Sequence, residues 1–229
     1  MPKFNFKRVR KLRDANRILN STLSHQRVVF PAISKLVVKN GEKYFAGTAF
    51  SVHPRILVTA AHCLFSKGSG LYKSATLFPG LHLNDQPYGK IFANKFSIPD
   101  EFREHYTPAY DFGCIILDRD LILPNYFSWQ HSPGANCIIK GYTYENMGNG
   151  ILWNTQSEFG GFTVLSSGIN EVRLENALYS GMSGSPYYSI NNGQLLSHGI
   201  YVSNDNYSST VCVNPQIAAF IDNIKNSLV

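Results

Sequence analysis

Residues 55–63 read Arg-Ile-Leu-Val-Thr-Ala-Ala-His-Cys. The stretch begins as a short run of aliphatic and β-branched residues, a composition typical of a buried strand. Ala60 and Ala61 then leave room for the chain to turn while it stays closely packed. The stretch therefore predicts a buried strand that ends in a helical turn, with His62 at the start of that turn.

Similar strand-like runs follow one another along most of the chain. Turn-forming clusters rich in Gly, Asn and Ser separate them, as at 39–42, 67–70 and 190–193. The predicted strands are 34–38, 43–52, 55–60, 74–78, 111–117, 137–142, 161–167, 186–190 and 195–203. This rhythm predicts an all-β protein, and the stretch from Leu123 to Gly134 is our expected crossing between two β halves.

Helical periodicity marks the two ends of the chain. Apolar residues return every three or four positions between Val9 and Leu19, which predicts a short amphipathic helix in a basic arm. After Pro215, Ile217 and Ile221 belong to one apolar helical face, together with Phe220 and Ile224. A helix is therefore predicted at each end of the β region.

The net charge of +6 is concentrated in the arm. The arm holds seven basic residues (Lys3, Lys7, Arg8, Arg10, Lys11, Arg13 and Arg17) and one acid, Asp14, so the charges of the remaining chain balance. Such an arm could bind anionic lipid or nucleic acid, but a solvated face of a packing helix is the preferred interpretation. We therefore expect no nucleic-acid partner and regard membrane association of the arm as the weaker alternative.

Targeting and metal-binding patterns are not evident in the sequence. No run approaches the roughly 20 apolar residues of a transmembrane helix, and the arm lacks the apolar stretch of a secretory signal peptide. The four cysteines, Cys63, Cys114, Cys137 and Cys212, contain no Cys-x-x-Cys pair, and no two histidines have metal-ligand spacing. We therefore expect no metal site and no cofactor, and the sequence assigns no compartment.

Residues 181–186, Gly-Met-Ser-Gly-Ser-Pro, place a serine in a glycine-rich turn. Missing side chains let a substrate carbonyl approach the backbone there. Ser183 would supply a nucleophilic hydroxyl, and the amides of Gly181 and Ser183 could stabilise the oxyanion that forms after attack. Taken alone, the same pattern also fits an ordinary surface loop.

A serine hydroxyl needs a base whose pKa lies near the working pH, and His62 meets that requirement. A carboxylate can hold the imidazole in one tautomer, and Asp111, which heads the apolar run 111–117, is the candidate. Each residue also has a structural interpretation, His62 as a packed histidine and Asp111 as a capping or turn residue. The catalytic interpretation predicts that the two side chains lie within hydrogen-bond reach.

Together, 59–63, 111–117 and 181–186 resemble the chymotrypsin-like serine protease family, in which histidine, aspartate and serine follow in this order. The resemblance covers about 34–213. It implies two six-stranded antiparallel β-barrels with the active site between them, and a monomeric endopeptidase that acts on protein or peptide substrates. The alternative is a protease-like binding protein that no longer turns over peptide.

This resemblance also divides the chain. It implies a basic amino-terminal arm over 1–33, a first barrel over 34–125 that carries His62 and Asp111, a second barrel over 126–213 that carries Ser183, and a carboxyl-terminal helix over 214–229.

Within the family, the Ser-Gly-Ser-Pro motif preceded by Met182 is similar to the glutamyl endopeptidase and exfoliative toxin branch. The resemblance implies a substrate pocket lined by the segments 178–180 and 201–203. The named lining residues are Leu178, Tyr179, Ser180, Tyr201, Val202 and Ser203, and a shifted register would bring in His198 instead of Tyr201. No acidic residue lies between Asn176 and Ser203, so basic side chains before the cut should be disfavoured. The family disulfides cannot form, because the partner positions near Phe45 and Ser189 are not cysteines.

Overall fold

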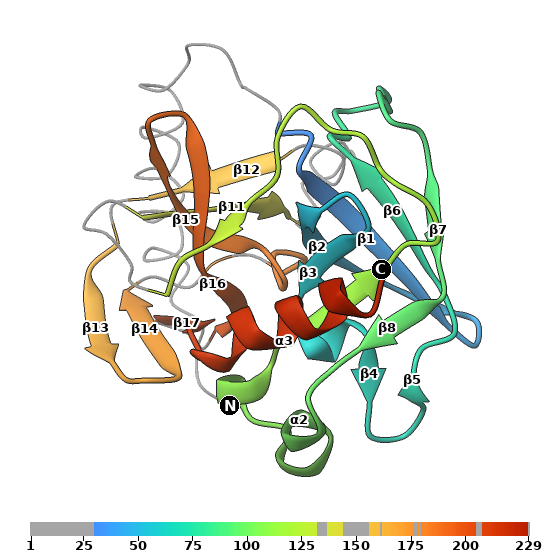
Figure 1. Cartoon of the computed structure of the whole chain (residues 1–229). Coiled ribbons are helices and arrows are strands. Elements are labelled where there is room, and N and C mark those ends of the chain that lie inside the picture. Colours follow the sequence, from blue (N-terminus) through green and yellow to red (C-terminus); the bar gives the residue numbers. More distant parts are fainter. Residues whose placement is uncertain are drawn as a thin grey trace, which may run out of the picture.

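The computed structural model describes residues 30–131, 137–143, 156–160, 162–175, 178, 180–204 and 208–228. Nearly all of the predicted arm lies outside these residues, and so does Tyr179 of the predicted pocket. The described chain is dominated by strands that gather into two groups, with one helix across the front of the junction between them (Figure 1).

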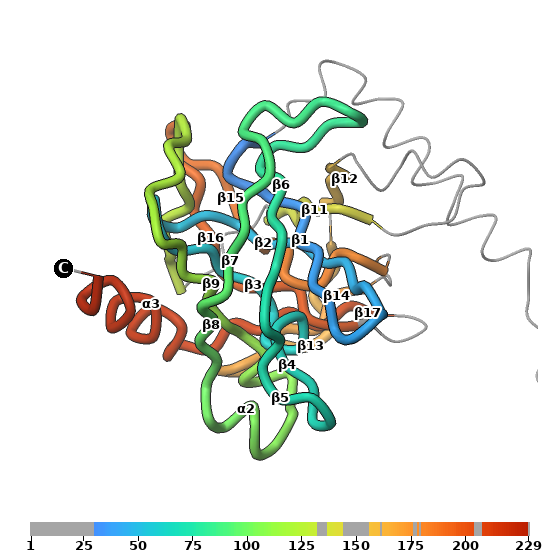
Figure 2. Tube along the Cα trace, turned by 90° about the vertical axis from the view of Figure 1, so that its right-hand side faces the viewer, coloured from blue at the N-terminus to red at the C-terminus, as the bar shows by residue number. Residues whose placement is uncertain are grey.

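The first group of strands forms a closed antiparallel sheet with the order β7-β6-β1-β2-β3-β9-β8. Its strands are β1 (Ile33–Asn40), β2 (Lys43–His53), β3 (Ile56–Thr59), β6 (Ala75–Pro79), β7 (Ile91–Ala93), β8 (Lys95–Ser97) and β9 (Gly113–Ile116). Only Asn94 separates the two edge strands, and Figure 2 shows β7 leading directly into β8. Since the two edges belong to one interrupted strand, the sheet closes into a barrel of six strands.

The second group repeats this arrangement with the order β12-β11-β15-β16-β17-β14-β13. Its strands are β11 (Ile138–Tyr142), β12 (Gln156–Phe159), β13 (Val164–Ser167), β14 (Glu171–Glu175), β15 (Pro186–Asn191), β16 (Gln194–Asn204) and β17 (Ser208–Cys212), and β10 (Ser128–Trp129) pairs in parallel with β16. The edge strands β12 and β13 are again neighbours in the chain. The predicted all-β fold of two six-stranded barrels is confirmed.

Short elements connect the strands and carry the site. They are a 3-10 turn η1 (Ala61–Cys63), a small hairpin of β4 (Phe65–Ser66) and β5 (Gly70–Leu71), the helix α2 (Asp100–His105) and a second 3-10 turn η2 (Pro108–Tyr110). The carboxyl-terminal helix α3 (Gln216–Asn226) follows Pro215.

Helix α3 is held by its apolar face. Ile217, Ile221 and Ile224 are its buried residues, and the ring of Phe220 meets the ring of Phe112 edge to face at 5.4 Å. Phe112 belongs to the first barrel, so a helix that follows the second barrel packs against the first. Aromatic pairs of this geometry add to the free energy gained by burial alone.

The two barrels also meet directly, and Thr48 on β2 lies at the centre of the contact. Its hydroxyl accepts a hydrogen bond from the amide of Tyr142 on β11 at 2.9 Å and donates to the carbonyl oxygen of Gly181 at 3.2 Å. The Tyr142 hydroxyl returns to the first barrel and donates to the carbonyl oxygen of Leu81 at 3.0 Å. Thr48 and Tyr142 are buried, so these bonds fix one barrel against the other.

No helix in the described part of the chain has the length and apolar character needed to span a membrane. All four cysteines fall within the described residues; each is buried and none forms a disulfide bond.

Candidate active site

His62 is placed by the end of β3. The strand residues Ile56–Thr59 are all buried, and Ala60 and Ala61 have no exposed surface. The Thr59 hydroxyl donates to the carbonyl oxygen of Thr48 at 2.7 Å and ties the strand end to β2. The chain then enters η1, where His62 remains partly exposed while its neighbours pack into the core. The small residues of 55–63 thus bring a histidine to the surface between the barrels.

Asp111 holds His62 with both carboxylate oxygens. It follows η2, is 6% exposed, and stands two residues before β9. One oxygen, Oδ2, lies 2.6 Å from Nδ1 of His62, and the other, Oδ1, accepts from the backbone amide of His62 at 2.9 Å. The predicted hydrogen-bond reach is confirmed. This geometry places a proton on Nδ1, so Nε2 is the ring atom that can accept one.

The pKa of His62 lies well above the ordinary histidine value. Burial acts to lower it, but the neighbouring Cys63 sulfur, the charge of Asp111 and the hydrogen bond to Asp111 raise it by more. The carboxylate favours the imidazolium because the two groups are in direct contact. The site thus stabilises a positive charge on His62.

Cys212, at the end of β17, and Asn214, which follows this strand, hold the turn that precedes Asp111. The carbonyl oxygen of Ala109, in η2, accepts from Nδ2 of Asn214 at 2.9 Å and from the Cys212 thiol at 3.4 Å. Both side chains are almost fully buried, and burial raises the pKa of Cys212 to about 12, so the thiol stays protonated and able to donate. The sequence analysis did not identify either residue, because nothing in a linear pattern shows that positions 109 and 214 meet.

The turn that carries Ser183 lies against β2 and against Cys63, the residue that follows His62. The carbonyl oxygen of Ser183 accepts from the amide of Thr48 at 2.8 Å, and the sulfur of Cys63 lies 3.8 Å from the same oxygen. On its other side the turn is bonded to β16, since the Gly184 amide donates to the carbonyl oxygen of Tyr201 at 2.8 Å. Strands β2 and β16, one from each barrel, therefore hold the serine turn in place beside η1 through backbone hydrogen bonds.

Gly184 is required by the closeness of this contact. Its φ of +88° is a conformation that side chains rarely adopt, and a Cβ there would collide with the Thr48 carbonyl oxygen and the Thr59 hydroxyl. The serine turn can approach β2 and β3 only because residue 184 has no side chain.

The amides of Gly181 and Ser183 are available as donors. Gly181 has a φ of +90°, and its carbonyl oxygen is held by the Thr48 hydroxyl. Among the residues that the structure describes, none accepts a hydrogen bond from the Gly181 or the Ser183 amide, whereas the Gly184 and Ser185 amides are used within the fold. Two unused amides in one turn can stabilise a developing negative charge.

An open cleft of about 330 Å³ lies beside this site. Its walls come from both barrels: His62, Phe102, Tyr106, Thr107, Pro108 and Asp111 from the first, and Val202 and Ser203 from the second. The structure thus brings two of the predicted pocket residues, Val202 and Ser203, to the cleft with His62 and Asp111. Tyr106 was not predicted; the run 100–107 offers no motif that distinguishes a cleft wall from a surface turn.

The other predicted pocket residues lie apart from this cleft. Leu178 and Tyr201 are buried in the core of the second barrel with Met182, and burial raises the pKa of Tyr201. Ser180 is exposed at the start of the serine turn.

His198 is engaged elsewhere in the second barrel. It is 2% exposed, its Nε2 lies 2.8 Å from the Ser189 hydroxyl, and its Nδ1 lies 2.8 Å from the Gln130 carbonyl oxygen. Burial lowers its pKa. With both ring nitrogens bonded to the fold, His198 does not reach the cleft, whereas its near neighbours Val202 and Ser203 do.

Within the described ranges, no group of three or more His, Cys, Asp or Glu side chains has the arrangement of a metal site. We therefore assign no metal ligand there.

Comparison with known proteins finds similarity to proteases. No model of a known protein family matches it. In sequence it is 28% identical to the glutamyl endopeptidase of Bacillus licheniformis over 62% of this chain and 44% of that protein. It is 26% identical to the extracellular metalloprotease of Bacillus subtilis over 65% of this chain and 48% of that protein. The chain thus spans less than half the length of these curated relatives.

Solved structures share the whole architecture. A Glu endopeptidase in complex with MPD superposes with a TM-score of 0.74 at 20% identity, covering 89% of this chain and 95% of that one. An inactivated protease paralogue of the scabies mite superposes with a TM-score of 0.67 at 15% identity, covering 86% and 95%. The fold therefore also occurs in an inactivated protein, and activity must be argued from the site.

Proposed function

We propose that this chain, which has the chymotrypsin-like fold and is similar in sequence to a glutamyl endopeptidase, is a serine endopeptidase. Ser183 is the nucleophile, His62 the general base and Asp111 the residue that orients it. The observation that carries the proposal is the double hold of Asp111 on His62, at 2.6 Å and 2.9 Å, beside the turn that bears Ser183. A purely structural aspartate would not need to fix the ring tautomer of a partly exposed histidine.

In the first half of the reaction, Oγ of Ser183 attacks the carbonyl carbon of the scissile peptide bond while Nε2 of His62 takes its proton. Asp111 stabilises the imidazolium through Nδ1. The amides of Gly181 and Ser183 donate to the tetrahedral oxyanion. When the C–N bond breaks, His62 returns the proton to the leaving amine and an acyl-enzyme remains on Ser183.

In the second half, a water molecule gives its proton to His62 and attacks the ester carbonyl. The tetrahedral intermediate collapses with return of the proton to Oγ of Ser183, and the carboxylic acid product leaves. The residues named here carry both halves, and every proton passes through Nε2 of His62.

The specificity pocket is proposed from the residues around the serine turn. No acidic side chain occurs between 176 and 203, so a buried Lys or Arg before the cut would lack a countercharge. Neutral and acidic side chains are therefore expected to be preferred before the cut.

A catalytically silent binding protein is the alternative, and the inactivated structural neighbour shows that the fold permits it. The geometry around His62 argues against it here. Loss of function removes the need to keep a buried carboxylate, a histidine and two unused amides together, yet all are present in this site.

Labelling with a fluorophosphonate probe tests the proposal directly. Wild-type protein should be labelled and should cleave a denatured protein substrate, whereas Ser183→Ala should lose labelling and lose turnover by roughly three orders of magnitude or more. Ser166→Ala, an exposed serine on β13, is the matched control and should behave as wild type. Unlabelled wild type, or an active Ser183→Ala variant, would overturn the assignment.

A further inference from the structure

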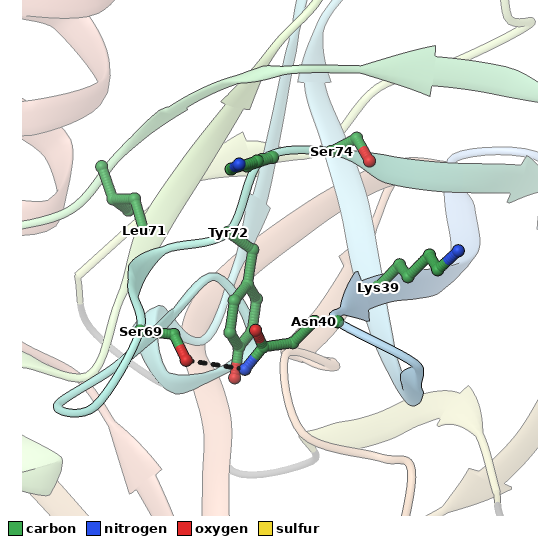
Figure 3. A pocket seen from close by; sticks show the side chains of 8 residues that line it. Lys39, Asn40, Ser69, Leu71, Tyr72 and Ser74 are labelled. Atoms are coloured by element: carbon green, nitrogen blue, oxygen red, sulfur yellow. Dashed lines mark hydrogen bonds between the residues drawn. The ribbon is translucent and has the colours of Figure 1, made fainter.

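Strand β1 is held differently at its two ends. At its outer end, Asn40 Nδ2 donates to the exposed Ser69 hydroxyl at 2.9 Å, a bond that joins two walls of an open cavity of about 430 Å³ (Figure 3). At its inner end, Ile33 is fully buried, and the chain that leads into the strand is bonded to Gln156 on β12 of the second barrel. The start of the first barrel is therefore anchored on the second barrel.

The side-chain amide of Gln156 makes four contacts at this anchor. Oε1 accepts from the backbone amide of Phe30 at 2.8 Å, and Nε2 donates to the carbonyl oxygen of the same residue at 2.8 Å. The same Nε2 lies 3.1 Å from the carbonyl oxygen of Ile33 and 3.2 Å from the hydroxyl oxygen of Tyr142. Because a side-chain amide offers both a donor group and an acceptor, one residue joins the entry of β1 to β11.

Gln156 belongs to a polar face of the β11–β12 pair. In the register of this pair Tyr142 lies opposite Gln156, and Lys140 lies opposite Glu158. Residues that lie opposite each other, or two apart on one strand, share a face. Lys140 is almost fully buried, and its ammonium lies 3.1 Å from the Glu158 carboxylate and 4.1 Å from the centre of the Phe30 ring. This face therefore holds both the backbone and the aromatic ring of Phe30.

Tyr142 connects the anchor to the serine turn. Its hydroxyl accepts from Gln156 and donates to the carbonyl oxygen of Leu81, so the side chain is fixed from two sides. Its backbone amide donates to the Thr48 hydroxyl at 2.9 Å, and that hydroxyl donates to the carbonyl oxygen of Gly181 at 3.2 Å. Gly181 carries one of the two amides proposed to stabilise the oxyanion. Three consecutive contacts thus lead from Gln156 to this turn.

Strand β11 also touches the serine turn directly. A Cβ at Gly141 would collide with the Ser185 hydroxyl and would lie 2.8 Å from the Thr48 hydroxyl oxygen. The backbone of β11 therefore lies against the turn without free space between them. Interiors packed this closely transmit the displacement of one segment to the next.

We propose that Gln156 is a positioning residue of the proposed protease. By holding Phe30 and Tyr142 together it fixes β11, and through Thr48 it fixes Gly181 in the oxyanion turn. The inference rests on the proposed function for its effect on turnover. Its structural part, the coupling of Gln156 to the serine turn, does not require turnover.

Steady-state kinetics with a peptide substrate test the effect on catalysis. Gln156→Met keeps the length of the side chain but removes its hydrogen bonds, so kcat should fall roughly tenfold because a displaced donor stabilises the oxyanion less well. KM should stay within about twofold, since other residues line the cleft beside His62.

Asn40→Ala is the matched control. It removes a side-chain amide bond from the other end of β1 and should keep the wild-type kcat. An unchanged kcat in Gln156→Met, or an equal loss in the control, contradicts the proposal.

A double-variant cycle with Thr48→Val distinguishes positioning from a general loss of stability. Because Gln156 acts on Gly181 through Thr48, the loss of kcat in Gln156→Met/Thr48→Val should be smaller than the product of the two single losses, by about threefold or more. Losses that simply multiply would show that Gln156 and Thr48 act independently.

Hydrogen exchange separates this inference from the proposed function, because it needs no turnover. The backbone amides of Gly184 and Ser185 are bonded within the fold, so their exchange reports how firmly the serine turn is held. They should exchange roughly tenfold faster in Gln156→Met than in wild type or in Asn40→Ala. This result supports the coupling even if the wild type proves inactive, and equal exchange in all of these proteins refutes it.

Phe30→Leu is a milder variant for the case in which Gln156→Met fails to fold. It keeps the backbone bonds to Gln156 and most of the apolar volume, but it removes the ring that Lys140 contacts. We expect kcat to fall about threefold with KM retained, and exchange at Gly184 to accelerate by a similar factor. Wild-type values in both measurements would show that the anchor does not position the serine turn.

Discussion

The side-chain amide of Asn214 donates to the carbonyl oxygen of Ala109 at 2.9 Å, across 105 positions of sequence. The same side chain accepts from the amide of Gln216 at 2.9 Å, at the start of α3. Asn214 therefore joins the last helix to the turn that precedes Asp111. The segment that orients His62 is held by a residue that follows the second barrel.

Replacing Asn214 with alanine should weaken both the fold and catalysis. The change removes one of the two donors to the Ala109 carbonyl oxygen and the partner of the Gln216 amide, and a hydrogen bond typically contributes about 0.5–1.5 kcal/mol. We expect a lower free energy of unfolding in urea and roughly a tenfold loss of kcat, because η2 can then shift Asp111. Asn223→Ala, exposed on the same helix, is the control. Equal behaviour of the two variants would show that Asn214 has no positioning role.

The pH dependence of kcat/KM should report the raised pKa of His62. Only the neutral imidazole can act as the base, so activity should rise with pH through a midpoint above the ordinary value of 6.5. Asp111→Asn removes the carboxylate that favours the imidazolium. The midpoint should therefore move to lower pH, and kcat should fall by about four orders of magnitude. Asp118→Asn, an exposed carboxylate beyond β9, should change neither quantity. A midpoint that stays in place without Asp111 would refute the electrostatic explanation.

Gly184→Ala should displace the serine turn and abolish the reactivity of Ser183. The substitution combines an unfavourable φ of +88° with a collision against Thr48 and Thr59, so the serine turn must move away from β2. Gly193→Ala is the matched control, because its φ of +79° is similarly strained but nothing lies within 4 Å of its Cβ. We expect the control to cost about 1 kcal/mol of unfolding free energy. Gly184→Ala should cost several times more and lose fluorophosphonate labelling. Similar thermal midpoints for the two variants would show that the close approach is not needed.

Thr48→Val should loosen the junction of the barrels. Valine has nearly the shape of threonine but can neither accept from the Tyr142 amide nor donate to the Gly181 carbonyl oxygen. The buried Tyr142 amide then loses its partner, at about 1–3 kcal/mol, and the half-buried Gly181 carbonyl oxygen loses one as well. We expect lower stability and a larger effect on kcat than on KM, because Gly181 lies in the turn whose amides are proposed to stabilise the oxyanion. Thr76→Val on β6 provides the comparison, and a Thr48→Val enzyme with wild-type kcat would contradict this role.

Cleavage of a peptide library should favour neutral and acidic residues before the cut over Lys and Arg. A buried ammonium or guanidinium would lose its hydration without gaining a carboxylate partner. The measurement is the ratio of kcat/KM for peptides that differ only at that residue. Efficient cleavage after Arg would show that the proposed pocket is wrongly located.

Much of the fold could be predicted because strand periodicity is local. All nine predicted strands overlap observed ones, from β1 to β16. The strands β12, β14 and β17 were missed. Gln156–Phe159 has a single apolar residue, at its end, and Ser208–Cys212 begins with hydroxyl residues. Glu171–Glu175 alternates charged and apolar residues, but the run is too short for this period of two to be recognised. The strands β7 and β8 have three residues each, too few for a pattern.

The site residues could be predicted only where they belong to a motif of adjacent residues in the sequence. His62, Asp111 and Ser183 sit in recognisable stretches, and the distance between His62 and Asp111 followed from their roles. Thr48, Cys212 and Asn214 could not be found this way, since each acts through a contact more than 90 positions distant. The family resemblance predicted Val202 and Ser203 as pocket residues, and both line the cleft, but it could not show that Leu178 would be buried.

The order of the chain gives the two-barrel junction a further consequence during synthesis. The histidine and aspartate segments leave the ribosome first, while the serine turn and Asn214 follow about 70 positions or more later. At that stage the hydrogen-bond partners of Thr48 and Ala109 in the later part of the chain have not yet been synthesised. The proposed catalytic site is therefore completed only after the serine turn and Asn214 have been added.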